Sequence, residues 1–289
     1  SGKNGMNVQE VIGADFPRVD QAYSVRDTIL YALGVGFGSE PLDPSHLAFL
    51  YEEGLRAAPT MANVLGYPGL WMAEERFGIN WRRILHAEHR LELYEPLPAS
   101  GAIFGQNRVV AIVDHEERGA MMHQRNDITE AGTGRRLAST IMSILLRGDG
   151  GCGTHGEAPA PLDPLSDRAP ERSVEVASWE AQPLIYRLSG DLHPLHVDPE
   201  LARAMGFERP ILHGLATMGM AGYALLREYA GMAPERLRSM AVRLTAPVLP
   251  GDRLRFEFWD EGHGLIRFRA VVPGRGGVKV IDRGTAILA

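Results

Sequence analysis

The 289-residue chain is 45% hydrophobic, so it can bury a large core as one big domain or as two domains of ordinary size. Its net charge of −6 and pI near 5.9 show no basic footprint, which argues against nucleic acid as a partner. The single cysteine, Cys152, cannot form an internal disulfide bond and suits a reducing compartment. No apolar run is long enough to span a bilayer, so we expect no membrane partner.

The first half of the chain begins with helical patterns and continues with strands. Residues 24–34 start with a capping-box-like Ser-Val-Arg-Asp sequence, carry an apolar stripe and end at a glycine, which predicts a helix. A second short helix is expected over 45–53. Alternating polar and apolar residues then predict strands over 90–94, 102–114, 119–127 and 135–147. Short polar turns between these strands indicate an antiparallel sheet.

The second half repeats this plan after a segment rich in glycine and proline. We expect residues 151–172 to be a linker between an N-terminal domain, 1–150, and a C-terminal domain, 173–289. The patterns of the second domain predict a strand over 173–177, a short helix over 178–186, a long helix over 214–229, and strands near 253–261, 265–273 and 277–288. The long helix is apolar almost all round, so it should be buried. Both halves contain a strand, two prolines, a glycine turn and a strand, which suggests an internal duplication.

An acid and two histidines lie close together in the Gly-Asp-Leu-His-Pro-Leu-His sequence of residues 190–196. Asp191 and His196 are five residues apart, which would place them on different faces of a continuous helix. Pro194 disfavours such a helix, so the segment should fold back as a turn that can direct both side chains to one point. A short capped helix over 198–206 should support the far side of the turn.

This segment resembles a family signature. The sequence Tyr-Arg-Leu-Ser-Gly-Asp over 186–191, then Pro-Leu-His over 194–196 and Arg-Pro-Ile-Leu-His-Gly-Leu over 209–215, is similar to that of the hydratase 2 (MaoC-like) family. The likeness covers nearly the whole chain. It implies an α+β double hot-dog fold, in which two antiparallel sheets each wrap a helix and the N-terminal unit is degenerate. It also implies an (R)-specific enoyl-CoA hydratase that interconverts trans-2-enoyl-CoA and (3R)-hydroxyacyl-CoA.

The resemblance sets further expectations about ligands and location. The substrate would be a coenzyme A thioester, with no cofactor and no metal, and the protein would be a homodimer. We expect a cytoplasmic protein if the source is bacterial and a peroxisomal one only if it is eukaryotic; the chain ends in Ala-Ile-Leu-Ala rather than Ser-Lys-Leu. Two alternatives stay open. One is a dehydratase for a branched, dicarboxylic or steroid-side-chain CoA ester, and the other is an acyl-CoA-binding protein without activity.

The resemblance also assigns roles to residues. Asp191 and His196 would activate one water as an acid–base pair, and it stays open which of them acts on which proton. The backbone N–H of Gly214, at a helix N-terminus, would stabilise the thioester oxyanion. Four further residues are expected near the substrate, two of them at positions that the family uses near its pocket and two beside the catalytic acid: Glu88, Arg187, Ser189 and Gly190.

His193 departs from the family, which usually has asparagine at this position. Histidine is bulkier and can carry a charge, so it could reshape the pocket, or it could simply keep one hydrogen-bond donor there. A metal site made of His193, His196 and Asp198 is disfavoured because no further ligand is arranged around it. The first half lacks a helix as apolar as 214–229. By analogy, its shortened equivalent would open a tunnel for the acyl chain, so the first half would shape the pocket and the second would carry the catalytic residues.

Overall fold

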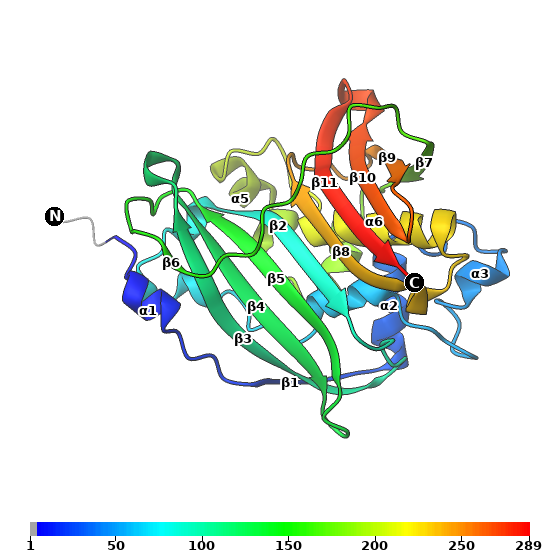
Figure 1. The fold of residues 1–289 in the computed structure, drawn as a ribbon, viewed down its shortest axis with the longest axis horizontal. Helices are drawn as coiled ribbons and strands as arrows, with labels where there is room; N and C mark the ends of the chain where they lie inside the picture. Colours follow the sequence, from blue (N-terminus) through cyan, green and yellow to red (C-terminus); the bar gives the residue numbers. More distant parts are fainter. Residues whose placement is uncertain (1–4) are drawn as a thin grey trace.

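The computed structural model describes residues 5–289, and its centre is one antiparallel sheet of eleven strands with helices on one face (Figure 1). The strands are β1 (Val19–Tyr23), β2 (Ile84–Leu93), β3 (Gly101–Asp114), β4 (Ala120–Glu130), β5 (Arg136–Leu146), β6 (His155–Gly156), β7 (Arg172–Ala177), β8 (Leu237–Leu244), β9 (Arg253–Asp260), β10 (Leu265–Val272) and β11 (Val278–Leu288). The α-helices are α1 (Val8–Ile12), α2 (Val25–Gly34), α3 (Pro44–Leu47), α4 (Gln182–Tyr186), α5 (Pro199–Ala204) and α6 (Gly214–Tyr229). Short 3-10 segments include η1 (Pro59–Val64), η6 (Arg187–Ser189) and η7 (Pro194–His196). No helix in residues 5–289 has both the length and the apolar character needed to cross a membrane.

The sheet shows the duplication that the sequence suggests. Its strand order is β1-β3-β4-β5-β2-β8-β11-β10-β9-β7, with β6 paired to β3. Read outward from the central pair, β2 and β8, each half places its strands in the same chain order. The central pair is antiparallel, with Glu88 opposite Arg243 and Leu91 opposite Met240. The two halves therefore share one continuous hydrogen-bonded sheet.

Helix α6 has the bounds predicted for the long apolar helix, and it is buried. Every residue from Ala216 to Leu226 is buried. Two glycines let neighbours approach closely: a Cβ at Gly219 would lie 2.5 Å from Val35, and one at Gly222 would lie 2.7 Å from Thr60. Dense packing on all sides explains why this helix has no polar face.

The first half has only a short segment beside α6. Segment η1 is buried along its whole length and packs against α6, β2 and β5. It is six residues long, whereas α6 has sixteen. The prediction of a shortened equivalent in the first half agrees with this geometry, and the room beside η1 forms part of the cavity described below.

Two of the predicted short helices are shorter than expected. The helix expected over 45–53 is α3, and it ends at Leu47. It ends there because Phe49 turns into the core, where its ring centroid lies 4.4 Å from that of Phe37. Instead of starting at Ser178, helix α4 starts at Gln182, because the Ser178 hydroxyl donates a hydrogen bond to the carbonyl of Asp252. Tertiary contacts override local helix signals at both positions.

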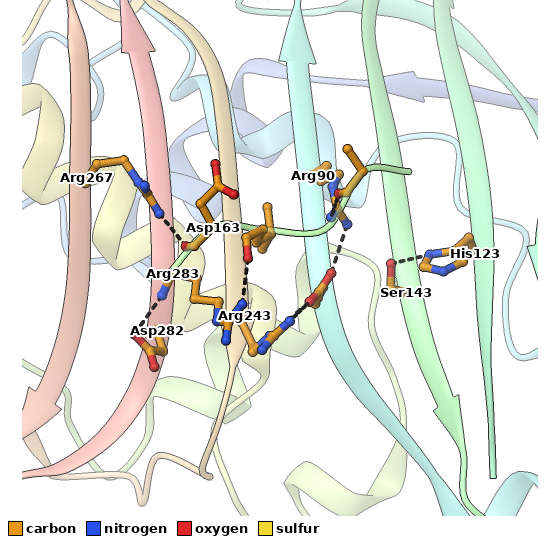
Figure 2. Close-up of polar contacts among 11 residues, drawn as sticks. Arg90, His123, Ser143, Asp163, Arg243, Arg267, Asp282 and Arg283 are labelled. Atoms are coloured by element: carbon orange, nitrogen blue, oxygen red, sulfur yellow. Dashed lines mark hydrogen bonds and ion pairs between the residues drawn. The ribbon is translucent and has the colours of Figure 1, made fainter. Parts of the chain in front are cut away.

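The glycine- and proline-rich segment crosses the face of the sheet turned away from α6 (Figures 1 and 2). Three strand arginines donate hydrogen bonds of 2.7–2.8 Å to its carbonyls: Arg90 to Ala160, Arg267 to Asp163 and Arg283 to Leu162. The segment is thus tied to both halves of the sheet. Under it, Arg243 of β8 forms a two-pronged ion pair with Glu88 of β2, at 2.8 and 2.9 Å. Arg90 approaches the other carboxylate oxygen of Glu88 at 3.1 Å.

Candidate active site

The turn over residues 190–196 is built by two side chains that cap their own backbone. The carboxylate of Asp191 accepts the N–H of His193 at 3.1 Å, and Nδ1 of His193 accepts the N–H of Leu195 at 3.0 Å. Gly190 has a φ of 132°, which a residue with a side chain rarely adopts, so glycine is needed where the chain leaves η6. Asp198 then caps α5 through the N–H groups of its first turn, as predicted.

This turn brings Asp191 and His196 together. Their possible ligand atoms lie within 4.8 Å of each other. Nδ1 of His196 donates to the carbonyl of Ile211 at 2.8 Å, because a carbonyl oxygen can only accept. Nε2 of the neutral ring is therefore a free acceptor. Burial lowers the pKa of His196, and the charge of Asp191 offsets part of this effect. At neutral pH the pair thus offers a carboxylate and an imidazole lone pair to one water.

Gly214 lies beside this pair at the first position of α6. The first N–H groups of a helix have no carbonyl within the helix, and the positive end of the helix dipole adds to their attraction for a negative oxygen. A Cβ at residue 214 would lie 2.5 Å from Leu244, so glycine permits this close contact with β8. Gly214 lines the same cavity as Asp191 and His196.

The cavity has a volume of about 380 Å³ and lies between the two halves of the chain. Gly190, Asp191, His193, His196 and Gly214 all line it, together with apolar side chains of the second half. The first half contributes mostly apolar residues: Val64, Leu70, Met72, Ile84, Met142 and Ile144. This wall of the cavity lies beside η1, where the first half has no long helix.

Three of the expected substrate contacts lie elsewhere. Glu88 is not among the residues that line the cavity; it pairs with Arg90 and Arg243 on the opposite face of the sheet. Arg187 and Ser189 also lie outside the cavity lining, and Nε of Arg187 and Oγ of Ser189 are buried without a hydrogen-bond partner. A shift of one residue along β2 or η6 would change which side chains face the cavity, and the sequence motif does not specify this register.

The first half also contributes polar groups that no sequence pattern indicated. Tyr67, His86 and Asn63 line the cavity, and buried His89 bridges two of them. His89 Nε2 lies 3.0 Å from the amide oxygen of Asn63, and His89 Nδ1 lies 3.3 Å from His86 Nε2. Burial lowers the pKa of His86 to about 4, against the charge of Asp191, so this ring is neutral. The first half therefore presents an uncharged polar group to the cavity.

A bulge in β2 explains why His86 faces the cavity while Glu88 does not. The pairing of β2 with β5 shifts register between these two residues. In a regular strand, residues two apart point to the same face. The extra residue turns His86 to the side of His89, and Glu88 stays on the outer side with Arg90. The His-Ala-Glu-His sequence carries no recognisable signal for this bulge.

His193 is neutral and caps the backbone of the turn. Nδ1 must be unprotonated to accept the N–H of Leu195, and burial lowers the pKa of His193, with Asp191 opposing the shift. An asparagine side-chain oxygen could accept the same N–H group. His193 therefore places no positive charge in the site at neutral pH.

For the His193→Asn variant we expect kcat at pH 7.5 to stay within about tenfold of wild type, because one acceptor replaces another in a single hydrogen bond. The folded-state pKa of His193 lies below its ordinary value of about 6.5, so its contribution to stability is complete above that pH and declines as the pH falls. Urea denaturation from pH 7.5 to 5 should show a smaller loss of stability in the variant. A steeper loss than in wild type would contradict this role.

Two side-chain groups in residues 5–289 have the composition of a metal site. In the first, Asp191, His196 and His213, the two imidazoles stack face to face at 3.6 Å and 23°, so one ion cannot lie in both ring planes. The second contains His46 with Glu40 and Asp43. There Nδ1 of His46 accepts the N–H of Gly38, and Nε2 lies 3.3 Å from the hydroxyl of Tyr223. Both arrangements disfavour metal coordination.

Comparison with known proteins gives matches over both halves. Residues 21–148 match the model of the MFE-2 hydratase 2 N-terminal domain, and residues 163–282 match that of the MaoC like domain. The chain is 38% identical to 3-hydroxyacyl-thioester dehydratase Y of Mycobacterium tuberculosis, over 90% of each chain. It is 32% identical to a probable enoyl-CoA hydratase 2 of Dictyostelium discoideum, over 98% of this chain and 97% of that one.

Solved structures give the same picture of the fold. A MaoC-like dehydratase from Phytophthora capsici superposes with a TM-score of 0.86 at 30% identity, covering 98% of this chain and 99% of that one. The fold is the α+β double hot-dog, as expected from the motif. Because the alignments extend over nearly the whole chain, the likeness includes both halves.

Proposed function

The chain belongs to the MaoC-like and hydratase 2 family, a group of hydro-lyases that act on acyl thioesters, and on this premise we propose that it is an (R)-specific 2-enoyl-CoA hydratase. The reaction would add water reversibly to trans-2-enoyl-CoA and give the (3R)-hydroxyacyl-CoA. The observation that carries the proposal is the convergence of three groups on one cavity: the carboxylate of Asp191, the free Nε2 of His196 and the N-terminal N–H of α6 at Gly214.

In the proposed mechanism, one water lies between Asp191 and His196. Both groups are hydrogen-bond acceptors, so each can accept one hydrogen bond from the water, and an oxygen lone pair is then directed at C3. As the C3–O bond forms, one of the pair takes a proton and the electrons of the double bond move to the thioester oxygen. The enolate then collapses and C2 receives that proton from the same pair. The other proton of the water stays on the new 3-hydroxyl, so the addition is balanced.

Charge on the thioester oxygen is stabilised by the N-terminus of α6. The N–H of Gly214 is fixed at the start of a sixteen-residue helix that is buried from Ala216 to Leu226, so it costs no reorganisation during the reaction. The alternative assignment of Glu88 to the substrate is not needed for this chemistry, because the site already holds two acid–base groups and an oxyanion donor.

Support for an acyl substrate comes from the rest of the cavity. Its first-half wall is largely apolar and lies beside η1, which suits a hydrocarbon tail rather than a sugar or nucleotide. The same wall holds the neutral His86 and Tyr67, so a substituted acyl group stays an alternative to a plain fatty acyl chain. A dehydratase for such a specialised CoA ester would use the same three groups.

The first test follows the loss of enoyl-thioester absorbance with crotonyl-CoA and with a long-chain trans-2-enoyl-CoA, and resolves the configuration of the product. Rapid formation of the (3R) product supports the proposal, and a (3S) product would contradict it. If folded protein binds both thioesters and turns over neither, the protein is a binding module or acts on another acyl group. That it forms a homodimer stays a prediction, which the mass from light scattering would test.

Substitution of the first-half wall should separate short from long substrates. Met142 is half-buried on β5 and lines the cavity, so Met142→Trp fills space that a long tail would occupy. Loss of room for even one methylene changes discrimination by roughly 10- to 200-fold, so we expect kcat/KM for the long-chain substrate to fall by at least about tenfold. Turnover of crotonyl-CoA should be retained. Met121→Trp, on β4 and outside the cavity lining, is the matched control and should leave the ratio of the two substrates unchanged.

A further inference from the structure

His213 touches both members of the proposed catalytic pair. Its ring stacks on that of His196, with centroids 3.6 Å apart and planes 23° from parallel. Its Nε2 donates to the backbone carbonyl of Asp191 at 3.2 Å, since that oxygen can only accept. His213 also directly precedes Gly214, as the residue at the N-cap of α6, and its side chain makes no capping bond there. One side chain thus connects Asp191, His196 and the oxyanion donor.

The ring is held in a neutral form among the groups that face it. Those groups are Asp191, His193 and His196 of the catalytic turn and Tyr186 at the end of α4, whose ring lies 4.8 Å away. Burial, together with the nearby His196, lowers the pKa of His213 to about 3, and Asp191 opposes these effects. A neutral His213 can face His196 whether that ring is neutral or protonated, without placing two positive charges in contact.

The surroundings of His213 are costly for stability. The side chain is 1% exposed, and its Nδ1 has no hydrogen-bond partner within residues 5–289. The hydroxyl of Tyr186, which is fully buried, also lacks a partner in this described part of the chain. A buried acceptor left unpaired lowers the stability of the fold, so an apolar residue of similar size would be more favourable for packing alone. Packing alone therefore does not account for a histidine at this position. The stack of its ring on His196 and the hydrogen bond from its Nε2 to Asp191 need a functional explanation.

We propose that His213 is a positioning residue for the hydration reaction: its ring fixes the orientation of the His196 imidazole, and its Nε2–H fixes the backbone at Asp191. Through these two contacts it keeps the carboxylate of Asp191 and Nε2 of His196 at the separation that one water can bridge. The inference rests on the proposed function for its effect on rate, while the effect on His196 itself is independent of any substrate.

The test uses variants that remove the two contacts separately. His213→Phe keeps an aromatic ring and loses the hydrogen bond, His213→Asn keeps an N–H donor and loses the ring stack, and His213→Ala loses both. Small displacements of reacting groups cost up to about 100-fold in rate, so for His213→Ala we expect kcat to fall by roughly 10- to 100-fold with KM almost unchanged. The other two variants should fall between it and wild type.

The matched control removes one buried polar atom beside the ring of His213. Tyr186→Phe keeps the neighbouring ring and deletes only the unpaired hydroxyl, so its kcat should equal that of wild type, with equal or higher thermal stability. Equal losses of kcat in Tyr186→Phe and His213→Ala would overturn the inference, because any disturbance of this region would then have the same effect.

A measurement without substrate completes the test. The imidazole nitrogen-15 chemical shifts of His196 should show one tautomer in wild type, with the proton on Nδ1, and a mixture in His213→Ala. If folded His213→Ala keeps the single tautomer and the wild-type kcat, His213 has no positioning role. If wild type hydrates no enoyl thioester, the proposed function fails, and the tautomer of His196 still decides whether His213 orients it.

Discussion

Asp191→Asn should lower kcat for crotonyl-CoA by roughly 10²- to 10⁴-fold, the range typical of losing a general acid–base group. The amide oxygen can still accept the N–H of His193, so the turn should keep its shape and KM should change little. What is lost is a group that can take up a proton from the water and release it again. The measurement is a steady-state rate across substrate concentrations for the purified variant beside wild type.

Asp198→Asn is the matched control for this substitution. Asp198 lies seven residues further along and caps α5 through the N–H groups of Glu200 and Leu201. Asparagine is about as good a helix cap as aspartate, so stability should change by no more than a few tenths of a kcal/mol, and kcat should be that of wild type. Wild-type turnover by Asp191→Asn would rule out the assigned catalytic pair, and loss of turnover by Asp198→Asn would implicate the turn as a whole.

Glu88→Gln should produce a large loss of stability and little loss of activity. The side chain of Glu88 is 11% exposed and pairs with Arg243, whose side chain is 35% exposed, and with Arg90, at 16%. Removing one partner of a buried ion pair costs about 3–5 kcal/mol, and the partial exposure of the arginines reduces this to about 2–4 kcal/mol. Arg243 joins Glu88 across the central β2–β8 pair, and Arg90 also bonds the crossing linker, so urea denaturation should report the loss as a lower midpoint.

The control for Glu88→Gln is Glu92→Gln, which lies on the same strand, four residues further along, and is exposed. Its hydrogen bond from Tyr94 is on the surface, so the free energy of unfolding should change by less than about 0.5 kcal/mol. If Glu88→Gln raised KM for an acyl-CoA several-fold without lowering stability, the initial expectation of a substrate contact would be right and the ion-pair interpretation wrong.

Local patterns in the sequence were sufficient where one signal dominates. The capping box of Ser24 and Asp27 is present at the start of α2, and the bounds of α6 follow from its apolar run and its flanking glycines. The strands that were predicted lie within a few residues of their expected ranges, except that β2 extends earlier, to Ile84. No range was predicted for β1, β6 or the central strand β8. No continuous helix runs from Asp191 to His196, because η6 ends at Ser189 and η7 begins at Pro194. The turn between Gly190 and His196 brings both side chains to one cavity.

Contacts between residues distant in the sequence decided which first-half side chains face the cavity. Whether Glu88 or His86 faces the cavity depends on the register of β2 against β5, in which His86 pairs with Ile144 and Glu88 with Ser143. The alternation in β2 itself does not set this register. The first-half groups Tyr67 and Asn63 reach the cavity because η1 is short and packs on α6, and no local pattern around residues 59–80 predicts this.

The sequence by itself determined the chemistry that we propose for this protein, because the motif over 186–215 supplies Asp191, His196 and the helix N-terminus at Gly214 within one short stretch of chain. Only the tertiary structure decided what surrounds that chemistry: the neutral state of His193, the ring of His213 against His196, and the apolar wall from the other half. Burial and packing set protonation and orientation, and both arise from residues that are distant in the sequence. The reactive groups are therefore local, and their environment is not.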